Sequence, residues 1–221
     1  MQHATPRRVA TAIVLVAAVS LPPAASAFRF PAISIEAGGS STDLQSPDYV
    51  QTHRIAGGTG GVAFDVHLGE QFSIEPGVLF VRRGARLPDI EVSDPGGNSL
   101  GTYQTYLTAD YADVPVLGRF EPPTTNAFKP FAILGPRFGF KTAERSEARG
   151  SVSRTADSSL FEDFEFGVTV GGGMEYGIGR HRLVFDLRYD SGLTKHDDGQ
   201  GGDFRTEAVL LMAGYVFHPE P

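Results

Sequence analysis

The feature that most constrains this chain is a period-2 alternation of apolar and polar residues, which recurs along most of its length. Residues 183–190 give the clearest example, because they read LVFDLRYD and place one apolar side chain at every second position. Successive side chains of a β-strand point to opposite faces, so this pattern indicates strands and not helices. The alternation predicts eight strands, at Ala32–Ala37, Ile55–Leu68, Gln71–Arg83, Tyr106–Phe120, Ala127–Lys141, Phe164–Ile178, Leu183–Asp190 and Arg205–Phe217.

The segments between these strands alternate in length. Three are short, at residues 69–70, 121–126 and 179–180. Four are long and rich in Gly, Ser, Asp, Thr and Pro, at roughly residues 38–53, 84–104, 142–162 and 191–204. An even number of antiparallel strands, joined alternately by tight turns and long loops, is typical of an up-and-down barrel. We therefore predict a single barrel with all four long loops at one end.

The two faces of the predicted strands differ in composition, and this difference decides which face lies inside. One face carries Leu, Val, Ile and Phe, with aromatic residues towards the strand ends, which is typical of a lipid-facing band. The other mixes Gly and Thr with ionisable residues, which suits a lumen just wide enough to be filled by side chains. A closed barrel also satisfies every backbone polar group in lipid. The sequence therefore predicts an all-β, eight-stranded antiparallel up-and-down transmembrane β-barrel.

The inward face of this barrel would carry a charge network of seven acids and six bases. Its predicted members are Glu36, Asp65, Glu75, Arg83, Asp113, Arg119, Lys129, Arg137, Lys141, Glu165, Glu175, Asp186 and Arg188. Near-balance of charge favours ion pairs that fill the lumen, whereas a conducting pore more often shows one dominant sign at its constriction. We therefore expect a packed lumen and keep a narrow channel for small solutes as the alternative.

The N-terminus has the pattern of an export signal. Arg7 and Arg8 precede an apolar run of 13 residues, Val9–Leu21, which is short for a membrane-spanning helix. Ala25-Ser26-Ala27 then forms a small-residue cleavage site. We predict a signal peptide at residues 1–27 and an outer-membrane β-barrel domain at residues 28–221.

The overall composition excludes several classes of protein. With 26 Asp+Glu against 19 Lys+Arg, the chain has a formal net charge of −7, which argues against nucleic acid as a partner. The absence of Cys excludes disulfides, thiol catalysis, cysteine-ligated zinc and lipid attachment to Cys. No second long apolar run follows residues 9–21, which excludes a multispanning helical membrane protein.

Several strand motifs occur in an order that matches a known family. These are a Gly-rich strand at Gly57–Leu68, the turn Gly69-Glu70, FSIEPGVLF at Phe72–Phe80, DYADVPVL at Asp110–Leu117, PFAILGP at Pro130–Pro136, and residues 166–173 and 187–193. In this order they resemble the porin-family outer-membrane β-barrel proteins of the PorT-like group. The resemblance implies a barrel in the outer membrane of a diderm (Gram-negative) bacterium, and little about activity. It also implies that the barrel insertion machinery reads Phe217, which stands where these barrels carry a terminal aromatic residue.

Histidine and serine are the residues most suited to catalysis at the rim of a barrel. His67 and His181 lie beside predicted short turns, whereas His53 and His196 lie at the edges of long loops. The segment His196-Asp197-Asp198, together with Asp203, could bind a cation or serve acid–base chemistry. It lacks the spacing of a calcium loop, so we expect a solvated acidic loop there. Four serines lie in the third long loop, namely Ser151, Ser153, Ser158 and Ser159. None of them lies in the Gly-x-Ser-x-Gly motif of a nucleophilic serine.

We therefore assign no catalytic residue, cofactor or metal ligand, and we expect a protein that is not an enzyme. Its expected role is structural or binding, with the long external loops carrying any ligand. The expected partners are outer-membrane lipid, the barrel insertion machinery and an external ligand at the loops. Besides the narrow channel, two alternatives remain: a barrel enzyme acting at the rim through His53 or His196, and a secreted soluble barrel that binds a small apolar ligand.

Overall fold

The computed structural model describes residues 32–45, 52–93, 96, 99–125, 127–149, 154–156, 160–178, 181–197 and 203–217. The predicted signal peptide at residues 1–27 lies outside these residues, as do Ser151, Ser153, Ser158 and Ser159. Within the described part of the chain, no helix has the length and the hydrophobicity that crossing a membrane requires.

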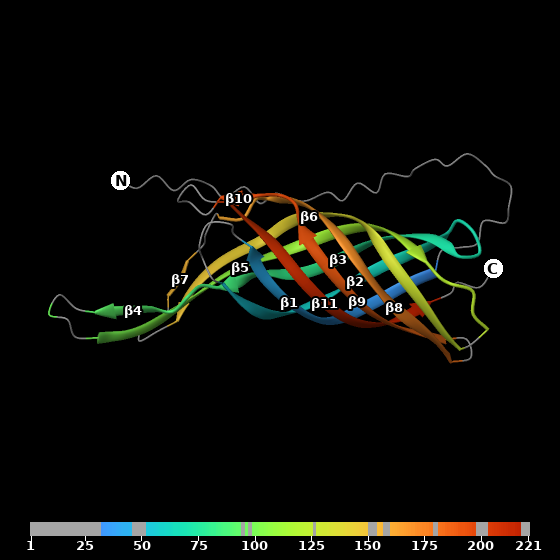
Figure 1. Cartoon of the computed structure of the whole chain (residues 1–221), viewed down its shortest axis with the longest axis horizontal. Helices are drawn as coiled ribbons and strands as arrows, with labels where there is room; N and C mark the ends of the chain where they lie inside the picture. Colours follow the sequence, from blue (N-terminus) through green and yellow to red (C-terminus); the bar gives the residue numbers. More distant parts are fainter. Residues whose placement is uncertain are drawn as a thin grey trace, which may run out of the picture.

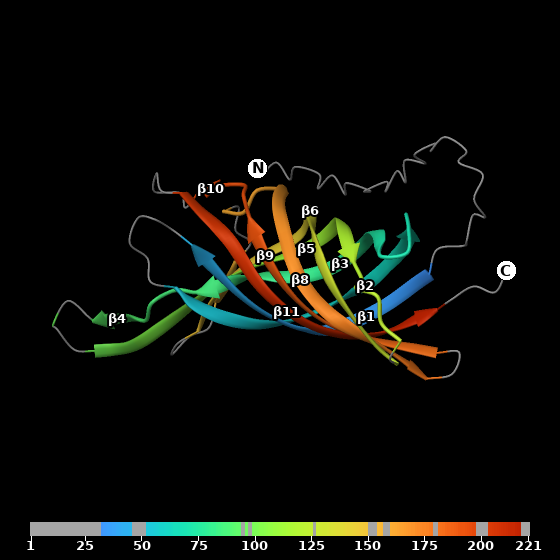
Figure 2. The ribbon, with the colours of Figure 1, turned by 45° about the vertical axis from the view of Figure 1, so that its right-hand side comes forward.

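Eight long strands form a closed antiparallel barrel, as the alternation predicted (Figures 1 and 2). They are β1 (Ala32–Gln45), β2 (His53–His67), β3 (Phe72–Arg86), β5 (Ser99–Phe120), β6 (Phe128–Arg149), β8 (Phe164–Ile178), β9 (His181–Gly192) and β11 (Asp203–Phe217). Each strand pairs with its neighbour along the chain, and β1 pairs with β11 to close the ring. The predicted fold class is therefore confirmed.

The two ends of the barrel differ. We call the end with the short connections, such as 68–71 and 121–127, the turn end; β1 starts there and β11 ends there. The opposite end, which we call the loop end, carries three short strands: β4 (Ile90–Ser93), β7 (Arg154–Ala156) and β10 (His196–Asp197). Figure 1 shows β4 and β7 projecting beyond the barrel on the left. Because outer-membrane barrels have short periplasmic turns and longer extracellular loops, the predicted location implies that the loop end faces the cell exterior.

The predicted loop boundaries were wrong, because much of each long segment is strand. β1 continues to Gln45 and β6 to Arg149, and β4 pairs with the start of β5 as an extension of the wall. In these extensions the outward side chains are polar, as at Ser41 and Asp43 of β1. The apolar alternation therefore ends where a strand leaves lipid, although its hydrogen bonds to neighbouring strands continue.

An apolar belt covers the outward face between the two ends. At the turn end it carries the ring pairs Phe72–Phe120 and Phe128–Tyr176, with centroids 5.0 and 4.5 Å apart. Towards the loop end it carries Phe138–Phe166 and Phe140–Phe164, both 5.6 Å apart. Leu, Val and Met side chains lie exposed between them. This arrangement is a lipid-facing band with an aromatic girdle at each margin.

The inward face alternates between polar and apolar layers. Along β3, Glu75 is followed towards the loop end by Leu79 and Val81, then by Arg83 and Ala85, and all five are buried. Leu79 and Val81 belong to an apolar cluster with three residues of β11, namely Ala208, Leu210 and Met212. The lumen is therefore filled by apolar as well as charged side chains.

Candidate functional site

The charged groups of the lumen form two clusters. The first, which we call the loop-end cluster, contains Arg83, Asp113, Arg137, Glu165 and Asp190, all of which are at most 2% exposed. They come from five different strands. Each one meets the others in the lumen because it occupies an inward position of its strand.

Every ion pair of the loop-end cluster involves Arg83 or Arg137. Arg83 binds Asp113 through two hydrogen bonds and reaches Asp190 at 3.2 Å (Nη2–Oδ2). Arg137 binds Glu165 and lies 3.8 Å from Asp113 (Nη1–Oδ2). Buried charges are tolerated only when they are paired and hydrogen-bonded, so these contacts hold the five strands in one arrangement.

Two threonines complete the loop-end cluster. Thr169 donates to Asp190 at 2.6 Å, and Thr206 donates to Glu165 at 2.7 Å. Three guanidinium nitrogens remain without a hydrogen-bond partner among the described residues: Arg83 Nε, Arg137 Nε and Arg137 Nη1. The cluster is therefore dense but not fully satisfied.

The second group, the turn-end cluster, contains Glu36, Glu75, Arg119, Glu175, Asp186 and Arg188. Arg119 bridges Glu175 at 2.5 Å and Glu75 at 3.2 Å. Arg188 contacts three carboxylates, at 2.5 Å to Asp186, 3.0 Å to Glu36 and 3.2 Å to Glu75. Glu75 accepts from both arginines and so joins the two halves of the cluster. Arg119 also lies over the Phe131 ring, with its guanidinium carbon 3.8 Å from the centroid.

The structure divides the thirteen residues of the predicted lumen network. Ten are buried in the two clusters, at 6% exposure or less: Glu36, Glu75, Arg83, Asp113, Arg119, Arg137, Glu165, Glu175, Asp186 and Arg188. Asp65, Lys129 and Lys141 lie at the margins with intermediate exposure. Lys141 pairs instead with Glu144 at 2.9 Å and with Asp163 at 3.1 Å, near the loop end.

Three further residues lie in or over the loop-end cluster and are missing from the predicted network. Asp190 follows the alternation of Asp186 and Arg188 in β9, so its inward position was available from the pattern. Tyr111 is fully buried and donates its hydroxyl to the Glu162 carbonyl at 3.1 Å. His196 is the third, and no local pattern points to it.

The expectation that His196 belongs to a solvated loop was wrong. Its ring is fully buried, because β10 pairs with β11 and brings His196 opposite Phe204. The ring stacks on Phe204 and contacts Phe161, at centroid distances of 5.1 and 5.5 Å. Nδ1 accepts from the Glu162 amide at 2.9 Å, so the proton lies on Nε2, which donates to Glu165 at 3.2 Å.

His196 therefore forms part of a cap over the loop-end cluster. Its ring neighbours belong to an apolar cluster of Leu44, Ala85, Leu107, Ala109, Tyr111, Phe161 and Phe204. This cap separates the Glu165–His196–Thr206 contacts from solvent, so they offer no surface on which a substrate could react. His53, in contrast, is exposed at the loop end.

One group of acids among the described residues has the spacing of metal ligands, namely Asp65, Glu121 and Glu175. Two arginines already form ion pairs with these acids. Arg119 lies 2.8 Å from Glu121 and 2.5 Å from Glu175, and Arg182 lies 3.3 Å from Glu175. The group is thus part of the ion pairs of the turn end.

Comparison with known proteins places this barrel in a family. The model of the outer membrane protein beta-barrel domain matches residues 24–198, which is well over half of the chain. The chain belongs to this family. It is an outer-membrane β-barrel protein, located in the outer membrane of a diderm (Gram-negative) bacterium and embedded in lipid. This membership, together with the exposed apolar belt, excludes the soluble ligand-binding barrel.

Several solved structures of outer-membrane proteins match this chain along most of its length but share little sequence with it. Ail of Yersinia pestis, solved in complex with the heparin analogue sucrose octasulfate, is 16% identical over 85% of this chain and 99% of its own, with a TM-score of 0.42. OprG of Pseudomonas aeruginosa is 13% identical over 87% and 98%, with a TM-score of 0.45. A major outer membrane protein of Thermus thermophilus is 17% identical over 85% and 98%, also with a TM-score of 0.45. No curated protein matches the chain.

Proposed function

We propose that this protein is a non-catalytic, non-conducting outer-membrane barrel that serves as a scaffold for a binding surface at its loop end. The observation that carries the proposal is the filling of the lumen. Arg83 and Arg137 are at most 1% exposed and cross-link strands at one level, and Arg119 and Arg188 do so at another. A conducting lumen needs mobile water and ions where these guanidinium groups are held.

The extended loop end supports a binding role. β5 and β6 are 22 residues each and continue as a paired ribbon beyond the apolar belt. Rigid strands that project from a membrane barrel hold side chains in fixed positions, and such positions are suited to recognition. A lumen without passage leaves these projecting parts as the functional portion of the molecule.

Two finer assignments are part of the same proposal. The ordered strand motifs, including FSIEPGVLF at Phe72–Phe80, support membership of the PorT-like group within the barrel family. Phe217 ends β11 at the turn end with its side chain exposed, which suits recognition by the barrel insertion machinery. Removal of residues 1–27 as a signal peptide would precede this step.

A narrow channel for small solutes is the second candidate, and one observation favours it. Buried polar atoms without hydrogen-bond partners among the described residues occur in both clusters, as at Arg137 Nη1 and Asp186 Oδ1. Such groups are typical sites of internal water. A chain of water through the lumen would pass small polar solutes if the arginine contacts opened.

Solute influx into proteoliposomes tests the proposal against the channel. The refolded residues 28–221 would be reconstituted into liposomes and exposed to a small sugar or amino acid, with an open porin as positive control. The proposal predicts swelling no faster than in protein-free liposomes. Swelling that increases with the amount of folded protein would overturn it in favour of the channel.

A further inference from the structure

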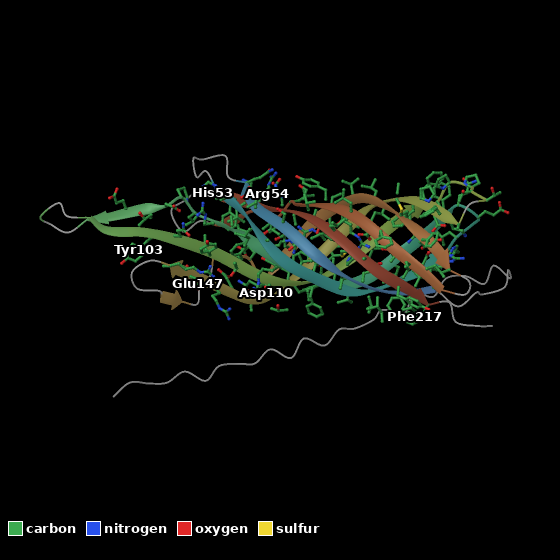
Figure 3. All side chains as sticks on the ribbon, turned by 90° about the horizontal axis from the view of Figure 1, so that it is seen from below. His53, Arg54, Tyr103, Asp110, Glu147 and Phe217 are labelled. Carbon is green, nitrogen blue, oxygen red and sulfur yellow. The ribbon has the colours of Figure 1, made fainter. Side chains whose placement is uncertain are left out.

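A groove lies on the outward wall of the barrel at the loop end, outside the lumen. It has a volume of about 470 Å³. Four strands line it: β2, β3, β5 and β6. The lining residues are His53, Arg54, Ile55, Ala56, Arg82, Arg86, Tyr106, Thr108, Arg145, Glu147 and Arg149. Figure 3 shows that His53, Arg54 and Glu147 all lie at the loop end, whereas Phe217 marks the opposite end.

The register of the strands explains how these side chains meet. His53 lies opposite Arg86, Arg86 opposite Tyr106, and Tyr106 opposite Glu147, which makes one outward row across four strands. Arg145 lies opposite Thr108 in the next row. Thr108 in turn lies opposite Gly84, which adds no side chain between Arg82 and Arg86. The groove is hollow because the row of Gly84, Thr108 and Arg145 carries no large side chain on β3 or β5.

The groove concentrates arginine in a chain that is acidic overall. Its lining contains five arginines and one acid, Glu147. Three of the arginines have close acidic partners: Arg82 pairs with Asp110 at 2.7 Å, Arg54 with Glu207 at 2.6 Å and Arg149 with Glu147 at 3.1 Å.

The remaining two arginines are more available. Arg86 lies 3.5 Å from Asp89, and Arg145 forms no ion pair within the described ranges. Guanidinium groups bind phosphate and sulfate through paired N–H donors, which ammonium groups cannot do. Tyr106 orients a third arginine of the groove, because the Arg149 guanidinium carbon lies 4.5 Å from the centroid of its ring.

The position of the groove relative to the apolar belt identifies the source of the anion. On β3 the outward residues run Val78, Phe80, Arg82, so the first groove arginine is the next outward position after the belt ends. On β6, the exposed ring of Phe140 is followed by the small exposed residue Ala143, which lies in the row of Arg82 and Asp110, and then by Arg145 in the next row. The groove therefore begins directly at the margin of the apolar belt, within reach of the lipid headgroups.

We propose that this groove binds the phosphorylated sugar headgroup of an outer-leaflet glycolipid. Arg86 and Arg145 bind the phosphate, and the hollow beside Gly84 and Thr108 holds the sugar to which it is attached. The volume suits a group of this size. This inference deepens the proposed binding role, but it does not depend on the lumen being closed, so solute influx and headgroup binding fail independently.

Native mass spectrometry of the refolded chain in mixed micelles tests the inference. The probes are diphosphorylated lipid A and the same lipid after removal of its phosphates, and the readout is the fraction of folded barrel that carries one lipid. The double variant Arg86→Gln/Arg145→Gln is compared with Arg205→Gln, an exposed outward arginine of β11 away from the groove. Heat-dependent gel mobility establishes that each variant is folded.

The inference predicts a preference for the phosphorylated lipid that the double variant loses by roughly tenfold or more, and that Arg205→Gln retains. Equal binding of the two lipids, or a double variant that binds like wild type, would overturn it. A third arm uses free glucosamine 1-phosphate. Binding of this soluble compound that is as tight as that of the lipid would overturn the assignment to a membrane source.

Discussion

Arg83 of β3 and Asp113 of β5 form an ion pair inside the barrel, with side chains that are 0% and 2% exposed. On the outer surface of the same two strands, Arg82 and Asp110 form a similar ion pair, with side chains that are 48% and 39% exposed. The chain thus contains a buried and an exposed version of the same contact between the same two strands. The two pairs differ in burial, and the buried pair also belongs to the loop-end cluster, where Arg83 reaches Asp190 as well.

The first prediction uses this pair of contacts. Asp113→Asn removes the carboxylate that accepts two hydrogen bonds from Arg83, so that this buried guanidinium group keeps only its hydrogen bond to Asp190. We expect the free energy of unfolding to fall by about 3–5 kcal/mol. Asp110→Asn breaks the exposed pair and should cost no more than about 1 kcal/mol. Urea titration in micelles, followed by gel mobility, measures both; equal losses would show that the lumen is open to water.

The second prediction concerns the apolar belt. Leu134 of β6 is 61% exposed on the outward face, a position that would be harmless for arginine in water. In lipid, Leu134→Arg should reduce the free energy of folding into vesicles by about 2–4 kcal/mol. Ala143→Arg, also exposed on β6 but beyond Phe140, is the matched control and should change little. Similar effects at both positions would argue against the assigned belt.

The third prediction concerns the backbone at Gly84. Its φ is 146°, and an added Cβ would lie 2.0 Å from the Leu107 carbonyl oxygen. Gly84→Ala should therefore destabilise the barrel by at least about 1–3 kcal/mol. Gly58 of β2 has open space around it, so Gly58→Ala is the control and should be nearly neutral. Urea titration of the two variants tests the difference, and a stable Gly84→Ala would contradict the backbone described here.

The fold could be predicted because lipid and lumen impose opposite demands on alternate residues. That requirement allowed the inward position of residues such as Arg137 and Glu165 to be predicted from sequence alone. The alternation could not define the strand ends. Beyond the belt the outward face lies in water, so outward residues such as Ser41 and Asp43 are polar like the inward ones. The position of His196 was predicted wrongly for another reason. Its burial depends on pairing with Phe204, and no sequence pattern near His196 indicates this pairing.

The fourth prediction concerns the cap formed by His196. The Glu162 amide donates to His196 Nδ1, so His196→Ala should speed hydrogen exchange at the Glu162 amide while the barrel stays folded. Lys195→Gln alters the neighbouring residue, whose side chain is 61% exposed, and serves as control. Exchange measured by NMR on the refolded protein would contradict the cap if the Glu162 amide were unaffected by the loss of His196.

The fifth prediction concerns pH and the groove. The hydrogen bond from Arg149 holds the pKa of the Glu147 carboxyl below its usual range, so Glu147 keeps its charge in mildly acidic solution. His53 is a second titratable side chain of the groove, so the test uses the His53→Gln background. A sulfate-ester probe, which stays ionised, should bind to this background equally from neutral pH down to the usual carboxyl range and more tightly only below it. Glu147→Gln should bind more tightly at neutral pH and lose this dependence. Titration with a sulfated sugar measures both effects, and tightening of binding to the His53→Gln background already near neutral pH would contradict the assignment.

The central claim is that side chains close the lumen, and ion conductance across a planar bilayer tests it most directly. Refolded residues 28–221, checked for the heat-dependent gel shift of a folded barrel, would be inserted while the current is recorded. The account predicts that insertion adds no stepwise current, whereas an open porin under the same conditions produces clear steps. Regular steps of one size from the folded protein would contradict the packed lumen and establish a channel.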